Sequence, residues 1–203
     1  MRQSKVIGVT GGVGAGKSTL LSYVQEQKGY TVILADEVGR HLTEKGKCVY
    51  KAVVKEYGTG ILDEKGNVDR KKLYEAAFTG KNADVGRLNA ITHPLIKREI
   101  KREITVDPSE IIFVEAALLY EGGLDALCDE VWYISSAEGI RKERLLKDRN
   151  YSYERSESIM GNQMSEAEFL EKSPVLIENT GSLKDFYRKI DEALERLGGA
   201  DVS

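Results

Sequence analysis

The sequence predicts an α/β fold in which helices flank a five-stranded parallel sheet, and three observations predict it. Five short segments rich in β-branched and aromatic residues show little alternation of polar and apolar positions, which is typical of strands buried on both faces. Stretches with helical periodicity separate most of these segments. A glycine-rich loop directly follows the first strand and opens a helix. The length of 203 residues fits one domain with a sizeable insertion.

The strands and the helices between them follow from these patterns. The five expected strands are Lys5–Val9, Tyr30–Ala35, Glu110–Ala116, Glu130–Ser135 and Pro174–Asn179. Helices are expected after the glycine loop, after the fourth strand and at the end of the chain, over Lys17–Gly29, Ala137–Arg149 and Ser182–Gly199. In the last of these, Ser182 and Asp185 have the spacing of an N-terminal capping pair, and Gly198 is expected to end the helix.

The segment between the second and third strands breaks the alternation, because it contains helical patterns and almost no strand. Helices are expected over Cys48–Gly58, over Asp69–Phe78 with Asp69 as N-cap, and over His93–Ile104 with Pro94 at the first helical position. The sequence therefore predicts a core of residues 1–36 and 110–203 and a helical insertion of residues 37–109. Insertions at the carboxyl end of a parallel sheet tend to build the ligand crevice.

The glycine loop, GVTGGVGAGKST, fits the pattern G-x-x-x-x-G-K-[ST] at Gly11, Gly16, Lys17 and Ser18. Its glycines let successive backbone N–H groups turn toward one centre, and the helix that follows adds its positive dipole end. Lys17 can reach the β- and γ-phosphates, and Ser18 can ligate Mg²⁺. The sequence thus predicts a three-layer P-loop NTPase fold. Nucleotide contacts are expected from Gly12, Val13, Gly14, Ala15, Gly16, Lys17, Ser18 and Thr19.

Other P-loop classes lack their defining residues in this sequence. A GTPase needs an N-K-x-D motif to read guanine, and the chain has none. The segment Asp63–Gly66 resembles D-x-x-G, but it lies in the helical insertion and is interpreted as a turn. Transporter-type ATPases require an apolar strand that ends in Asp, whereas the third strand here carries Glu115. These observations favour a small-molecule kinase.

Three features each have a functional and a structural interpretation. Asp36 follows the second strand, where a carboxylate can orient an acceptor hydroxyl and take its proton, or can cap a helix. The basic stretch Arg141–Arg155 is either a solvated helix face or a lid that closes arginines over ATP and excludes water. His93 precedes Pro94 and is either a cap or packing residue or a wall of the acceptor site.

Composition excludes several partners. A net charge of −3 gives no global electrostatic reason to bind nucleic acid. The apolar runs are too short for a secretory signal or a membrane span. Cys48 and Cys128 have neither metal nor redox spacing, so two buried thiols in a reducing compartment are expected. We therefore expect a cytoplasmic protein, a monomer or weak oligomer, with no nucleic-acid or membrane partner.

In their order along nearly the whole chain, these segments resemble the dephospho-CoA kinase family. The most specific block is LNAITHPLI, which in this family belongs to a helical CoA-side domain. The other matching segments are GVTGGVGAGKST, ADEVGRHLTEKG, GNVDRKKLYEAAF, VEAALLYEGGL, the lid stretch that contains LLKDRNYS, and LIENTGS. The chain departs from the family at Leu34, where a carboxylate is common, and at Lys147-Asp148-Arg149, where the family has Lys-Arg-Asp.

The resemblance implies transfer of the γ-phosphoryl group of ATP to the ribose 3′-hydroxyl of dephospho-CoA, the last step of CoA biosynthesis, with Mg²⁺. It implies Asp36 as the catalytic carboxylate and a short helical lid, about residues 141–163, that acts through Arg144 with Arg149 or Lys147. It further implies Asn179 on the nucleotide side and three residues on the acceptor side, Arg40, Arg87 and His93. A kinase for another nucleotide or small alcohol, and a nucleotide-dependent regulatory switch, are the alternatives.

Overall fold

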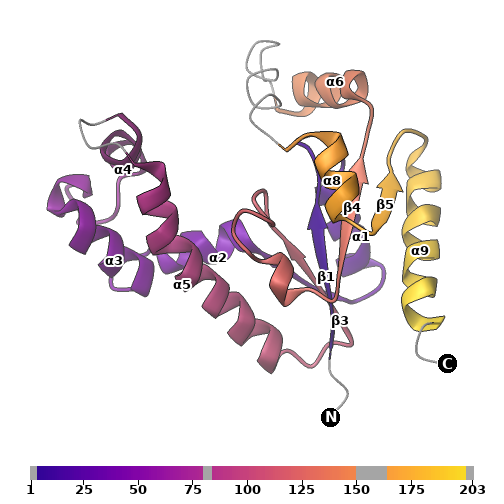
Figure 1. Ribbon diagram of the computed structural model, residues 1–203, viewed down its shortest axis with the longest axis horizontal. Coiled ribbons are helices and arrows are strands. Elements are labelled where there is room, and N and C mark those ends of the chain that lie inside the picture. Colours follow the sequence, from indigo (N-terminus) through magenta and orange to yellow (C-terminus); the bar gives the residue numbers. More distant parts are fainter. Residues whose placement is uncertain (1–3, 80–83, 150–163, 200–203) are drawn as a thin grey trace. The chain divides into compact units, whose positions relative to one another are not determined.

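The structure is a computed structural model that describes residues 4–79, 84–149 and 164–199 (Figure 1). The chain divides into two compact units. The core unit consists of Met1–Val32, Ser109–Leu119 and Asp125–Ser203, and the helical unit consists of Ile33–Pro108 and Tyr120–Leu124. Within the helical unit, Lys97 Nζ donates a hydrogen bond to the carbonyl of Gly123.

The sheet confirms the prediction of five parallel strands. Its strands are β1 (Lys5–Thr10), β2 (Thr31–Leu34), β3 (Ile111–Glu115), β4 (Glu130–Ser135) and β5 (Val175–Glu178). They lie in the order β2-β3-β1-β4-β5, and β1 pairs in parallel with both β3 and β4. Ile7, Phe113 and Trp132 on these three strands are completely buried. Burial on both faces explains why the strands show so little alternation in the sequence.

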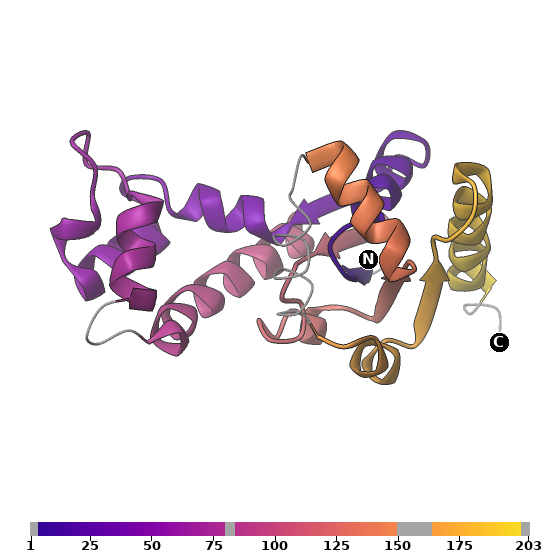
Figure 2. The same ribbon diagram turned by 90° about the horizontal axis from the view of Figure 1, so that it is seen from above.

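Helices cover both faces of the sheet. Those of the core unit are α1 (Lys17–Glu26), the short η3 (Asp125–Leu127), α6 (Glu138–Arg149), α8 (Glu166–Lys172) and α9 (Leu183–Gly199). Helix α9 packs against α1 and β5, α8 packs against β4, and Figure 2 shows α1 and α9 on one side of the sheet and α8 on the other. The fold therefore has the three layers that the sequence predicts.

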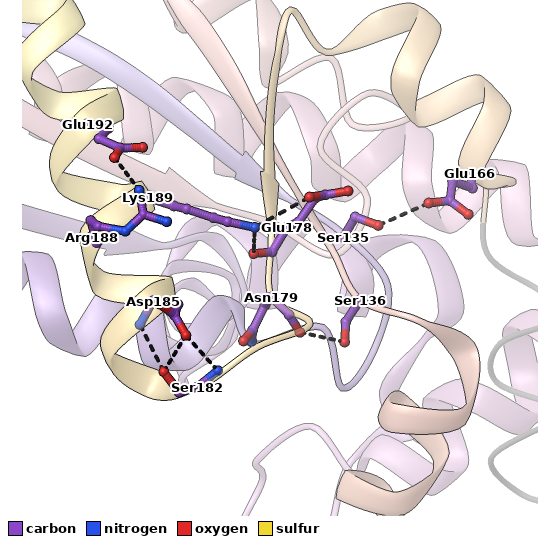
Figure 3. Close-up of polar contacts among 10 residues, drawn as sticks. All are labelled: Ser135, Ser136, Glu166, Glu178, Asn179, Ser182, Asp185, Arg188, Lys189 and Glu192. Atoms are coloured by element: carbon purple, nitrogen blue, oxygen red, sulfur yellow. Dashed lines mark hydrogen bonds and ion pairs between the residues drawn. The ribbon is translucent and has the colours of Figure 1, made fainter.

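Helix α9 begins as predicted and ends at Gly199, the last residue of the predicted range, but Gly198 does not stop it. Ser182 Oγ lies 2.5 Å from Asp185 Oδ2 and accepts a hydrogen bond from the Asp185 N–H, so the capping pair is confirmed (Figure 3). The prediction that Gly198 ends the helix is wrong, because α9 continues through Gly199. Gly198 lacks the positive φ of a left-handed helix stop, and Leu197 next to it is still buried.

The helical unit is built around one long helix. Its elements are α2 (Ala35–Leu42), α3 (Cys48–Tyr57), η1 (Thr59–Ile61), α4 (Arg70–Tyr74), the π-helical turn η2 (Glu75–Thr79) and α5 (Val85–Val106). Helices α2 and α3 both pack against α5, and Val49, Val53 and Ile100 are buried in this unit. Two local predictions are confirmed. Asp69 accepts hydrogen bonds from the backbone of α4, and Asp63 closes a turn with Asn67.

The prediction that a helix starts at Pro94 is wrong. Helix α5 starts at Val85 and is capped by the side chain of Asp84, which accepts a hydrogen bond from the Arg87 N–H. Pro94 lies inside the helix. Proline removes one backbone hydrogen bond there, which usually breaks a helix. The packing of α2 and α3 along α5 outweighs this local preference.

Among the described residues, no helix is both long and apolar enough to cross a membrane. Both cysteines are half-buried thiols.

The Cys128 thiol is expected to be inert in the folded protein. Burial, and then the charges of Asp125 and Asp129, raise its pKa from 9.0 to about 12. At pH 8 this makes the thiolate, the reactive form, about 10³-fold rarer than at an unperturbed thiol. Timed iodoacetamide labelling of a Cys48→Ser protein, followed by mass spectrometry, should show Cys128 modified only after unfolding. Labelling at the rate of a free thiol would contradict this.

Because the pKa of Cys128 is higher in the folded protein than in the unfolded chain, the free energy of unfolding should fall between pH 9 and 12.

Candidate active site

The glycine loop turns sharply between β1 and α1. Gly11, Gly14 and Gly16 have positive φ values of 147°, 80° and 108°. Gly16 is the N-cap of α1, and a Cβ added there would overlap the side-chain amide of Asn179. Glycine at this position is therefore required twice, by backbone conformation and by the close approach of Asn179. The loop leaves the first backbone N–H groups of α1 directed toward one site, which suits an anion.

Lys17 lies at the end of this loop and bends back over it. Its Nζ donates a hydrogen bond to the carbonyl of Gly11 at 2.8 Å. The same Nζ lies 3.8 Å from Oε1 of Glu115, and the two side chains are only 14% and 16% exposed. Glu115 ends β3, in register with Val9 of β1. From the sequence, Glu115 is interpreted only as evidence against a transporter-type ATPase. Its place at the carboxyl end of a neighbouring strand was the signal for this contact.

Asn179 and Arg144 both contact the loop backbone. Asn179 is 6% exposed, and its Nδ2 donates to the Ala15 carbonyl at 2.8 Å. The backbone carbonyl of Asn179 accepts a hydrogen bond from Ser136 Oγ at 2.8 Å (Figure 3). Arg144 Nη1 lies 3.3 Å from the Gly14 carbonyl, and its Nη2 lies 3.3 Å from Asn179 Oδ1. The structure therefore brings together two residues that the sequence placed on the nucleotide side and in the lid.

Arg141 is a residue of this site that sequence reasoning did not single out. A Cβ added at Gly12 would overlap its guanidinium, and its backbone packs against Gly14. Its Nε is buried and has no hydrogen-bond partner among the described residues. Arg141 precedes Arg144 by three positions on α6, so both side chains lie on one helix face. This spacing was the available signal.

The remaining nucleotide-side residues belong to the same loop. Val13 is half-buried, and Ser18 and Thr19 lie in the first turn of α1, with Ser18 exposed and Thr19 half-buried. Within the described ranges, no group of three or more His, Cys, Asp and Glu side chains could hold a metal ion.

The helical unit contains a cavity of about 530 Å³. It is lined by Ala35, Asp36, Gly39, Arg40, Arg70 and Ile96. Asp36 and Arg40 are one turn apart on α2, so both face this cavity. Leu34, not Asp36, is the N-cap of α2, so the structural alternative of Asp36 as a helix cap is wrong. The strand ends earlier than expected, and Asp36 falls inside the first helical turn. Arg70 comes from α4 and was missed in the sequence.

Two residues predicted for the acceptor side do not line this cavity. Arg87 is 61% exposed and forms an ion pair with Glu56, which links α5 to α3. His93 is half-buried in the middle of α5 and is not a helix cap. The predicted lid extends beyond the described residues. The side chains of Lys147, Asp148 and Arg149 and all of residues 150–163 lie outside them.

Comparisons with known proteins give one consistent result. The model of the dephospho-CoA kinase family matches residues 5–185. The dephospho-CoA kinase of Fusobacterium nucleatum is 34% identical over 195 residues, which cover 95% of this chain and 98% of that one. The dephospho-CoA kinase of Aquifex aeolicus is 36% identical over 195 residues, which cover 95% and 97%. The crystal structure of TT1252 from Thermus thermophilus matches with a TM-score of 0.78 and 26% identity, over 96% of this chain and 98% of that one.

Proposed function

The chain belongs to the dephospho-CoA kinase family, and from this premise we propose that it transfers the γ-phosphoryl group of ATP to the ribose 3′-hydroxyl of dephospho-CoA. The products are CoA and ADP. The observation that carries the proposal is the match of the family model to residues 5–185, which include the phosphate loop, the helical unit and the start of the last helix. The geometry of the loop supports the nucleotide half of this reaction, and the cavity in the helical unit supports the acceptor half.

The core unit binds ATP. Residues Gly12–Thr19 supply backbone N–H groups to the phosphates, as in other P-loop proteins. Lys17 exchanges its hydrogen bond to the Gly11 carbonyl for contacts with the β- and γ-phosphates. Arg144 lies on the same loop and supplies positive charge to the transferring group, with Arg149 or Lys147 as its partner in the lid. Asn179 acts by holding the Ala15 carbonyl, which fixes the loop conformation.

The residues at the loop fit Mg²⁺, which prefers oxygen ligands and keeps several waters when it binds a nucleotide. The exposed Ser18 hydroxyl, at the first turn of α1, would hold the ion together with the ATP phosphates. Bound there, Mg²⁺ would neutralise charge on the β- and γ-phosphates. A site of this kind needs no cluster of protein carboxylates, because phosphate oxygens and waters complete the coordination.

The helical unit binds dephospho-CoA. Asp36 in the cavity orients the 3′-hydroxyl and accepts its proton as the oxygen attacks the γ-phosphorus. The bond from phosphorus to the β–γ bridging oxygen breaks, and ADP leaves. Arg40, one turn away on α2, binds the anionic part of the acceptor. Arg87 and His93 remain predictions for the CoA side, outside the cavity.

The two thiols suit a reducing compartment, so we place the reaction in the cytoplasm. We propose that the protein is a monomer or a weak oligomer.

ADP release tests the function directly. Purified protein with Mg-ATP should release ADP in stoichiometric coupling to CoA formation when dephospho-CoA is added, and only slowly without it. A panel of nucleoside monophosphates and small alcohols should give no comparable stimulation. Stimulation by another acceptor would identify a different kinase. ATP binding with no acceptor-dependent ADP release would instead indicate a nucleotide-dependent switch.

A further inference from the structure

An exposed aromatic pair, Tyr74 and Phe78, follows the cavity-lining residue Arg70 along α4 and η2. Arg70 lines the cavity, Tyr74 lies one turn later, and Phe78 lies four residues beyond that in η2. The two rings stack with centroids 4.4 Å apart and an angle of 12° between their planes. Tyr74 is 54% exposed and Phe78 is 39% exposed, so neither ring belongs to the core of the helical unit.

The backbone that carries Phe78 is unusual. Residues Glu75–Thr79 form a π-helical turn, a geometry that is rare and occurs often at functional sites. An isolated pair of side chains one turn apart on a helix stabilises it only slightly. Local stability therefore does little to account for two large exposed rings that follow a cavity-lining arginine along the chain. A ligand that covers the pair would account for both the rings and the backbone turn.

Arg70 is the one basic side chain of α4 that lines the cavity. Its neighbours are engaged elsewhere, since Lys71 pairs with Glu75 and Lys72 donates to the Leu62 carbonyl. Arg70 itself has no ion pair or hydrogen bond with any described residue. In the cavity, Arg40 and Arg70 face the single carboxylate of Asp36. Among the described residues, Arg40 makes only an exposed 3.6 Å contact with Glu37, so both guanidinium groups can bind an anion.

The kinds of group at this site match the kinds of group in the acceptor. Asp36, Arg40 and Arg70 line one cavity, and the aromatic pair follows Arg70 along the chain. In dephospho-CoA the ribose 3′-hydroxyl is followed by the 5′-diphosphate and then by the pantetheine arm. We propose that Arg70 binds the diphosphate together with Arg40, and that the Tyr74–Phe78 pair binds the pantetheine arm. This inference rests on the proposed function and assigns the part of the acceptor that does not react.

The aromatic pair is tested with a Tyr74→Ser/Phe78→Ser variant. Its KM for dephospho-CoA should rise about tenfold or more, while kcat and the KM for ATP change less than twofold. ADP-ribose is the matched probe, because it keeps the adenosine 3′-hydroxyl and the diphosphate but lacks the pantetheine arm. Its inhibition constant against dephospho-CoA should not change in this variant. Val106→Ser, which removes another exposed apolar side chain of the helical unit, is the control and should leave every constant unchanged.

Arg70→Gln distinguishes the binding of the diphosphate from the binding of the pantetheine arm. It should raise both the KM for dephospho-CoA and the inhibition constant of ADP-ribose by about tenfold. An unchanged KM for dephospho-CoA in the aromatic variant would overturn the inference. An equal rise in the inhibition constant of ADP-ribose would also overturn it, because the rings would then contact the adenosine and not the pantetheine arm. If the double variant fails to fold, Tyr74→Leu and Phe78→Leu test the same contacts singly. A wild-type protein that makes no CoA would refute the proposed function itself, which is a different result.

Discussion

Replacing Asp36 with asparagine is expected to lower kcat by about 10²–10⁴-fold, the range that a positioned general base contributes. Asparagine keeps the size and a hydrogen-bonding oxygen of the side chain but cannot accept a proton. The phosphate loop belongs to the other unit and is untouched by the change, so Mg-ATP should bind with its normal dissociation constant. Steady-state kinetics with dephospho-CoA, combined with calorimetric titration of ATP, measure both quantities in one preparation.

The neighbouring residue supplies a matched control. Glu37 also lies in the first turn of α2 and is exposed, but it does not line the cavity. Glu37→Gln removes the same negative charge one position away, so any effect of charge on the helix end is common to both variants. Its kcat should stay within about twofold of the wild type. A folded Asp36→Asn protein with near-normal kcat would remove Asp36 from the mechanism.

Much of the fold could be predicted because it depends on local patterns. Buried parallel strands such as β1 and β3 are recognisable by continuous apolar runs, and Asp69 marks the start of α4 by its side-chain chemistry. Pro94 shows the limit of this reasoning. Its local preference predicts a helix start, but the packing of α2 and α3 on α5 decides the outcome. No property of the residues near Pro94 reports that packing.

The candidate site also has one part that local sequence patterns predict and another that depends on long-range contacts. The phosphate loop could be predicted because all its residues lie in one short segment, where the spacing itself encodes the geometry. Asn179 and Ala15 are 164 positions apart, and their contact exists only after β5 has joined the sheet. Arg70 reaches the cavity of the helical unit from a separate helix, so its place there depends on how α4 packs. Long-range contacts of this kind leave no periodic signal in the sequence.

Replacing Lys17 with alanine is expected to lower kcat/KM by about 10²–10³-fold, the loss seen when one preorganised charge-stabilising group is removed. The structure gives the physical reason. The Lys17 ammonium group is mostly buried, and its bonds to the Gly11 carbonyl and Glu115 hold it at the loop before ATP binds. Little reorganisation is therefore needed when negative charge develops on the transferring phosphoryl group. Alanine removes this charge and also leaves the Glu115 carboxylate without its Lys17 partner beside the phosphates.

Lys28→Ala tests whether any lysine near α1 has the same effect. Lys28 lies between α1 and β2 and forms a 2.7 Å ion pair with Asp191, so the two substitutions remove the same charge from the same unit. Lys28→Ala should cost some stability and leave kcat/KM within about threefold. Undiminished turnover in a folded Lys17→Ala protein would refute the role of Lys17. If only the KM for ATP rises and kcat does not change, Lys17 binds the ground state as tightly as the transition state. Only a contact that strengthens during phosphoryl transfer changes kcat.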